Sequence, residues 1–213
     1  MKKISIIAPI VLYLFVALIW VGILVQQHFK QSAEIKAKLE EAIGRDAGYT
    51  ETILKMESDS SHVTYGEFFE LCDKSVEQRT TLIVELRGLY PSVNNVTKEQ
   101  LIEFLNAEND TVRTKRDLYR KQMMLSTEMD NLTETVRDSP TSEYGWDYYR
   151  ERVTKAKLDL VKAASELQVS ATDFTDSYRK TLQLEGSVAK AADHAGIRFE
   201  ASFKEFAIQC RQS

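Results

Sequence analysis

A run of 22 uncharged and mostly apolar residues, from Ile4 to Val25, constrains the folding of this sequence more than any other feature. As an α-helix, with a rise of about 1.5 Å per residue, the run is about 33 Å long, which is enough to cross the hydrocarbon core of a bilayer. Lys2 and Lys3 precede it. We therefore predict a single membrane-spanning helix within a signal anchor formed by residues 1–25.

A cleaved signal peptide is the alternative for this segment, because it also begins with basic residues that precede an apolar core. The apolar core of a signal peptide spans only about 7–15 residues and ends at a cleavage site with small residues. Here the run is longer, and it continues into Gln26 and Gln27 with no Ala-x-Ala sequence. These differences favour an uncleaved anchor.

The orientation of the anchor follows less directly, because basic residues lie on both sides of the span. Lys2 and Lys3 oppose Lys30, Lys36 and Lys38, so the charge bias is nearly balanced. A short amino-terminal tail followed by a long polar region favours a cytoplasmic amino terminus, and the Met-Lys-Lys start is typical of bacteria. We expect a cell-membrane protein whose carboxy-terminal domain is periplasmic or extracellular.

The rest of the chain has the size and composition of one polar domain. Residues 26–213 carry 26 basic and 32 acidic side chains, a net charge of −6. Nucleic-acid binding depends on clustered positive charge, so we expect no nucleic-acid partner. We predict a membrane-proximal helix over residues 26–63 that packs as one domain with an antiparallel helical bundle over residues 64–213.

Apolar residues recur every three or four positions, which predicts an all-α, up-down bundle of four or five helices. Two helix starts carry a capping-box pattern, Thr64 with Glu67 and Thr97 with Gln100, and Pro140 ends the third helix. Each of the first four predicted helices carries one apolar stripe. In the first two helices the stripes comprise Phe29, Ile35, Leu39, Ile43, Tyr49, Ile53 and Met56, and then Tyr65, Phe68 or Phe69, Cys72, Val76, Arg79, Ile83 and Leu86. In the third and fourth they comprise Leu101, Phe104, Glu108, Val112, Lys115, Leu118, Leu125, Met129, Leu132 and Val136, and then Trp146, Tyr149, Val153, Ala156, Leu160, Ala164, Leu167, Ala171, Phe174, Tyr178 and Leu182.

Gly186 leaves the number of helices open, because the apolar spacing resumes after it and continues to Cys210. If the chain turns at Gly186, a fifth helix brings Cys210 to the same end of the bundle as Cys72. If the fourth helix is unbroken, the two sulfurs lie apart. A disulfide requires α-carbons within about 7 Å. Cys72 and Cys210 are therefore a candidate disulfide, and two buried free thiols are the alternative.

The sequence contains no recognisable catalytic or metal-binding pattern. His28, His62 and His194 are far apart, and neither His-x-x-x-His nor Cys-x-x-Cys spacing occurs. Gly-rich phosphate loops and nucleophile elbows are also missing from the sequence. We predict that the protein is not an enzyme and that it uses no cofactor and no metal.

Three polar residues interrupt the apolar stripes, namely Arg79, Glu108 and Lys115. In one interpretation Arg79 and Lys115 extend their charged ends to solvent, or one of them pairs with Glu108 between helices. In the other, Arg79 faces a pocket and binds a carboxylate ligand through both guanidinium arms.

An aromatic group follows the turn at Pro140. We expect Trp146 and Tyr149 to lie on the bundle seam, whereas Tyr144 and Tyr148 lie off it. Tyrosine is enriched at protein interfaces, so Tyr144 and Tyr148 are a candidate partner surface, with ordinary packing as the alternative.

These observations favour a membrane-anchored extracytoplasmic bundle that acts through protein contacts, as a scaffold or accessory subunit of an envelope complex. The expected partners are the membrane and another protein or a second copy of the chain. The alternative function is a ligand-binding sensor module that signals through a membrane partner.

Overall fold

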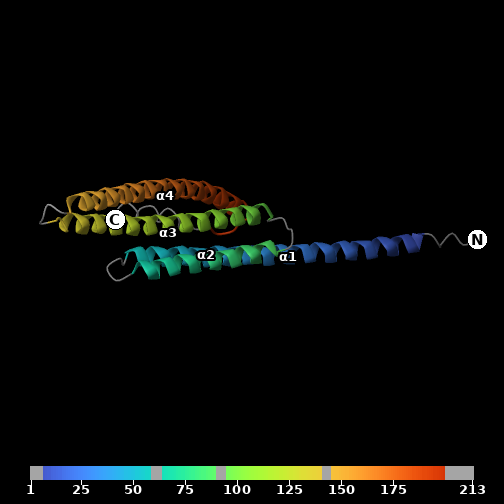
Figure 1. Ribbon diagram of the computed structural model, residues 1–213. Coiled ribbons are helices and arrows are strands. Elements are labelled where there is room, and N and C mark those ends of the chain that lie inside the picture. The colour runs from blue at the N-terminus through green and yellow to red at the C-terminus, as the bar shows by residue number, and fades with distance from the viewer. Residues whose placement is uncertain (1–6, 59–63, 90–94, 141–144, 200–213) are drawn as a thin grey trace, which may run out of the picture.

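The computed structural model describes residues 7–58, 64–89, 95–140 and 145–199, with side chains from Ala17 onward. This part of the chain contains four α-helices and no strand: α1 (Ile7–Ser58), α2 (Tyr65–Arg87), α3 (Asn95–Arg137) and α4 (Trp146–His194). The all-α prediction is confirmed. Successive helices run in opposite directions, and the α1–α2 hairpin lies against the α3–α4 hairpin (Figure 1).

The amino-terminal part of α1 extends beyond the bundle as an unaccompanied helix (Figure 1). Ile35 and Leu39 are buried, whereas Phe29, which we expected on the buried face, is 72% exposed. The prediction for Phe29 is wrong because this residue precedes the part of α1 that contacts other helices. Gly44 and Gly48 do not interrupt α1, since each is followed by buried positions that hold the helix in the bundle.

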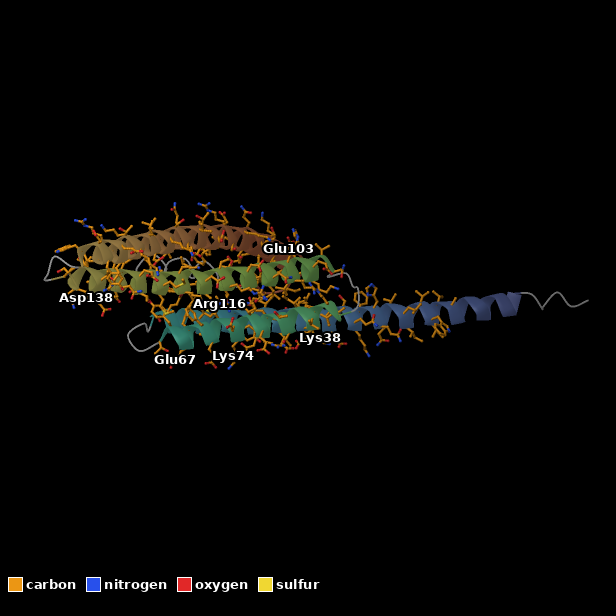
Figure 2. The ribbon with its side chains drawn as sticks, viewed as in Figure 1. Lys38, Glu67, Lys74, Glu103, Arg116 and Asp138 are labelled. Atoms are coloured by element: carbon orange, nitrogen blue, oxygen red, sulfur yellow. The ribbon has the colours of Figure 1, made fainter. Side chains whose placement is uncertain are left out.

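The α2 boundaries follow the predicted local signals. The Thr64 backbone N–H donates to Glu67 Oε2 at 2.9 Å, and the Glu67 backbone N–H donates to Thr64 Oγ1 at 3.3 Å, which completes the capping box. Gly88 caps the other end of α2. Glu67 and Lys74 lie on the side of α2 away from α3, whereas Arg116 of α3 lies between the two hairpins and pairs with Asp73 of α2 (Figure 2).

The predicted cap of the third helix is wrong. Because α3 begins at Asn95, Thr97 lies inside the helix and cannot be its N-cap. Its hydroxyl group instead donates a hydrogen bond to the Ala191 carbonyl of α4, at 3.2 Å. A tertiary contact has therefore replaced the local one that the sequence pattern indicated.

The fourth helix passes through Gly186 without a break and ends at His194. The chain turns at Gly196, which has a φ of +65°. There the Ile197 N–H donates to the Ala192 carbonyl at 2.8 Å, and the buried Ile197 side chain packs on the bundle. This is a Schellman-type end, in which glycine takes the left-handed position. The structure thus resolves the open question at Gly186 in favour of an unbroken helix.

Two apolar clusters form the core. The proximal cluster, named for its position next to the projecting part of α1, has contributions from all four helices. It comprises Ile35, Leu39, Ala42, Ile43, Leu82, Ile83, Leu86, Leu101, Ile102, Phe104, Leu105, Val188, Ala192 and Ile197. The distal cluster comprises Ile53, Leu54, Phe68, Cys72, Val112 and Phe174. Tyr65, which we placed on the α2 stripe, is 49% exposed at the first turn of that helix.

The α3–α4 hairpin continues past the distal end of α1 and α2 as a pair of helices (Figure 1). Only two helices meet there, so predicted stripe residues such as Met129 and Val136 are largely exposed. Trp146, expected in the core, is 41% exposed and packs edge-to-face on Tyr149 with ring centroids 5.5 Å apart. The prediction for Trp146 is wrong because no third helix covers this end of α4 among the described residues.

No helix among the described residues is both long enough and apolar enough to cross a membrane. Most of the predicted span from Ile4 to Val25 lies outside the described side chains, which begin at Ala17.

Candidate functional site

A layer of polar side chains lies in the middle of the bundle, between the two apolar clusters. We call it the central polar layer. Each helix contributes two residues to it, spaced three or four apart so that both face the same way. Its members are Asp46, Thr50, Ser75, Arg79, Glu108, Thr111, Thr181 and Glu185, and all are buried.

Arg79 holds the layer together from α2 and is 0% exposed. Its Nε donates to Asp46 Oδ1 at 2.5 Å, its Nη2 donates to Thr50 Oγ1 at 2.7 Å, and its Nη1 donates to Ser75 Oγ at 2.9 Å. Burial lowers the pKa of Arg79, but the nearby carboxylates Asp46 and Glu108 outweigh burial and raise it overall. Arg79 is therefore a buried cation that ties α2 to α1.

Glu108 faces Arg79 from α3 and is also 0% exposed. Its Oε2 lies 3.4 Å from Arg79 Nε, a distance that allows an ion pair, yet neither carboxyl oxygen makes a hydrogen bond within the described residues. Burial is the largest cause of a strongly raised pKa at Glu108, and the Asp46 carboxylate adds to it, while Arg79 opposes it. Glu108 is thus a buried carboxyl group whose charged form is disfavoured by its surroundings.

The α3–α4 side of the layer is joined by hydroxyl groups. Thr111 and Thr181 share a hydrogen bond of 2.9 Å between their Oγ1 atoms, and both residues are buried. Each hydroxyl can also donate to a carbonyl one turn earlier in its own helix, that of Ala107 or Ser177. The layer therefore connects all four helices through polar contacts.

A second polar contact lies near the distal cluster. Lys115 of α3 is 1% exposed, and its Nζ lies 2.5 Å from Glu57 Oε1 and 2.6 Å from Glu57 Oε2 on α1. Tyr119 donates a hydrogen bond to Glu57 Oε1 at 3.1 Å. Lys115 therefore does not extend to solvent, and Glu57 is a carboxylate partner that the sequence did not indicate.

The predicted site residues are distributed over the whole molecule. Cys72 is a buried thiol of the distal cluster, and burial raises its pKa to about 12. The unbroken α4 removes the turn at Gly186 on which the predicted disulfide depended. Cys210 and Tyr144 themselves lie outside the described residues, so the structure tests neither the disulfide nor the full partner surface. Tyr148 is 69% exposed on α4, with the Arg152 guanidinium carbon 6.0 Å from the ring centroid.

Sequence reasoning identified Arg79, Glu108 and Lys115 but missed Asp46, Thr50 and Glu185. The signal was present on α1, because positions 39, 43, 46, 50 and 53 keep a spacing of three or four. The predicted stripe passes through Tyr49, whereas Thr50 is the buried neighbour. On a helix that is polar over most of its surface, residues such as Asp46 and Thr50 are recognised as members of a polar layer only once their partner on the facing helix is known.

A cavity of about 450 Å³ lies elsewhere, at the proximal end of the bundle between the start of α3 and the end of α4. Thr97, Gln100, Lys190 and His194 are among the residues that line it. Arg79 is not one of them, so this cavity is separate from the central polar layer. No group of three or more His, Cys, Asp or Glu side chains in the described part of the chain has the arrangement to hold a metal ion.

Comparison with known proteins gives no relative for this chain: no family model, no curated protein and no solved structure matches it.

Proposed function

We propose that this chain is a single-pass, membrane-anchored helical bundle that acts through protein contacts, as a scaffold or accessory subunit of an envelope complex. The observation that carries the proposal is the apolar part of α1. Every large hydrophobic residue from Leu18 to Val25 is at least 45% exposed, and the same helix continues into the bundle. A helix that is apolar on all sides requires an apolar environment, which a bilayer supplies around the predicted span from Ile4 to Val25.

Extraction of membranes at alkaline pH tests the anchor. The wild-type chain should stay in the membrane pellet. Replacing Leu14 and Leu18 with lysine should release a substantial fraction, because each lysine near the middle of the predicted span costs up to about 3 kcal/mol. The matched control replaces Val84 and Val96, which are exposed on α2 and α3, with lysine and should behave as the wild type. Release of the wild-type chain would contradict the proposal.

Exposed apolar and aromatic side chains on α4 support the proposal of protein contacts. Tyr148, Leu158, Val161 and Val169 of α4 are each more than half exposed. Such side chains are typical of interaction surfaces. Changing Tyr144 and Tyr148 together to alanine should reduce the recovery of co-purifying proteins, whereas the control Tyr65→Ala should not. Unchanged recovery with the double variant would contradict this partner surface.

A sensor module is the second candidate, and the position of the central polar layer favours it. Asp46 and Thr50 belong to α1, the helix that we propose enters the membrane, so a change in the layer acts directly on the anchor. The sensor hypothesis predicts that at least one small carboxylate raises the melting temperature of the wild-type chain. If no carboxylate in a size series stabilises the wild type, the sensor hypothesis fails.

A further inference from the structure

The central polar layer sets two buried carboxyl groups beside one buried guanidinium group. Asp46 of α1 and Glu108 of α3 both lie within ion-pair distance of Arg79 of α2, at 2.5 and 3.4 Å from its Nε. An ion removed from water is stable only when it is paired and hydrogen-bonded. The layer therefore favours a state in which one carboxyl group is neutral.

The geometry around Arg79 Nε indicates that Glu108 is the neutral carboxyl group. Arg79 Nε carries a single hydrogen, and that hydrogen is directed to Asp46 Oδ1 at 2.5 Å. Glu108 Oε2 lies 3.4 Å from the same nitrogen and receives no hydrogen bond from it. A protonated Glu108 removes the uncompensated charge and becomes a donor toward the Asp46 carboxylate. Proton uptake by Glu108 thus removes the uncompensated charge and supplies the missing hydrogen bond.

The charged groups that face Glu108 from the neighbouring helices all raise its pKa, except for Arg79. Burial has the largest effect and raises the pKa of Glu108; Asp46 of α1 raises it next, and Glu185 of α4 adds a smaller contribution. Arg79 of α2 lowers it, but by less. The other members of the layer are the neutral hydroxyl groups of Thr50, Ser75, Thr111 and Thr181.

We propose that the central polar layer is a proton-binding site, in which Glu108 carries a proton at neutral pH and shares it with Asp46. The proton joins α3 to α1, the helix that leaves the bundle. Loss of this proton leaves two carboxylates beside one guanidinium, and their repulsion weakens the contact between α1 and α3. The site is independent of whether α1 enters a membrane, because all of its groups lie inside the bundle.

The sign of the pH dependence follows from proton linkage. An acid whose pKa is higher in the folded state than in the unfolded state binds more proton when folded. The stabilisation that this proton contributes is then fully present below the unfolded-state pKa of about 4.5, and it is lost as the pH rises through the folded-state pKa. In that window the ratio of folded to unfolded protein should fall by up to about tenfold per pH unit.

Urea unfolding of the full chain in detergent micelles, at intervals between pH 5.5 and pH 8.5, tests the proposal. Glu108→Gln keeps the size and the donor of a protonated carboxyl but cannot ionise. The matched control is Glu103→Gln, an exposed position on the same helix (Figure 2). We expect the stability of the wild type and of Glu103→Gln to fall with pH relative to Glu108→Gln. Equal pH dependence in all three proteins would overturn the proposal.

Infrared spectroscopy of the wild type gives a second test, which does not require any variant to fold. With glutamate labelled at the side-chain carboxyl carbon, a protonated Glu108 gives a carbonyl band distinct from that of carboxylates. We expect this band at pH 7 in the folded chain and its disappearance on unfolding at the same pH. A folded chain that shows only carboxylate bands at pH 7 would overturn the proposal.

Discussion

Replacing Arg79 with methionine should be among the most damaging single changes in this bundle. Methionine reproduces the aliphatic stem of arginine but ends where Nε stands, so the change removes the charge and the hydrogen bonds and leaves the space of the Cζ and Nη atoms unfilled. Asp46, whose side chain is 7% exposed, then keeps its charge without a cation, and the hydroxyl groups of Thr50 and Ser75 each lose a donor. Removing one partner of a buried ion pair costs about 3–5 kcal/mol, a large part of the total stability of an ordinary domain.

The same reasoning predicts that the damage is repaired by removing the acids as well. A triple variant, with Asp46→Leu and Glu108→Leu added to Arg79→Met, removes all three charged groups of this contact together. Replacing a buried ionic cluster with apolar residues of similar volume is often neutral, or stabilises by about 1–4 kcal/mol. The triple variant should therefore be at least as stable as the wild type, although it carries three substitutions in the core.

The assay is equilibrium urea unfolding of the full chain in detergent micelles, followed by far-ultraviolet circular dichroism. The matched control is Arg45→Met, because Arg45 of α1 pairs with Glu85 of α2 at 2.7 Å with side chains 37% and 51% exposed. Exposed pairs contribute about 0–1 kcal/mol. An Arg79→Met variant that loses no more than the Arg45→Met control would refute the reasoning, and so would a triple variant less stable than the single one.

Three further predictions concern local features. Thr64→Ala should lower the unfolding free energy by about 1 kcal/mol through loss of the α2 cap, measured by urea unfolding, and an unchanged midpoint would contradict the capping box. Gly196→Ala should destabilise by about 1–2 kcal/mol because its φ is +65°, whereas Gly186→Ala should stabilise by about 0.5–1 kcal/mol because open space surrounds that helical position. The opposite signs should appear as opposite shifts in melting temperature, and shifts of the same sign would contradict the turn at Gly196. In the reduced, folded chain Cys72, with its pKa raised to about 12, should resist maleimide at pH 7.5 until unfolding, as followed by peptide mass mapping; rapid labelling of the folded chain would contradict its burial.

Local sequence signals predicted local structure well where no tertiary contact competed. The Thr64 pattern forms its capping box as expected. The equivalent pattern at Thr97 does not, because the hydroxyl group there binds the backbone of α4. Gly186 and Gly196 look alike as helix-ending signals, but buried neighbours at Glu185 and Val188 hold the helix through the first. Such outcomes depend on which residues a neighbouring helix presents, and one sequence does not contain that information.

The candidate site was predicted in part for a similar reason. Arg79, Glu108 and Lys115 are conspicuous because charged residues seldom occupy an apolar stripe. Their partners Asp46 and Glu57 are ordinary acidic residues on a long polar helix, and only the packing of α1 against α2 and α3 distinguishes them. Spacing therefore identified the cations and the interrupted stripes, whereas the choice of partner required the three-dimensional arrangement.

Cross-linking mass spectrometry on intact native membranes, without reductant, is the most direct measurement of the central claim, that this bundle is held at a membrane and works through protein contacts. The same sample reports any peptide that joins Cys72 to Cys210. We predict reproducible links from the region around Tyr148 to another protein, or to a second copy of the chain. Links confined to single copies of this chain, in membranes that contain it at its natural level, would contradict the claim.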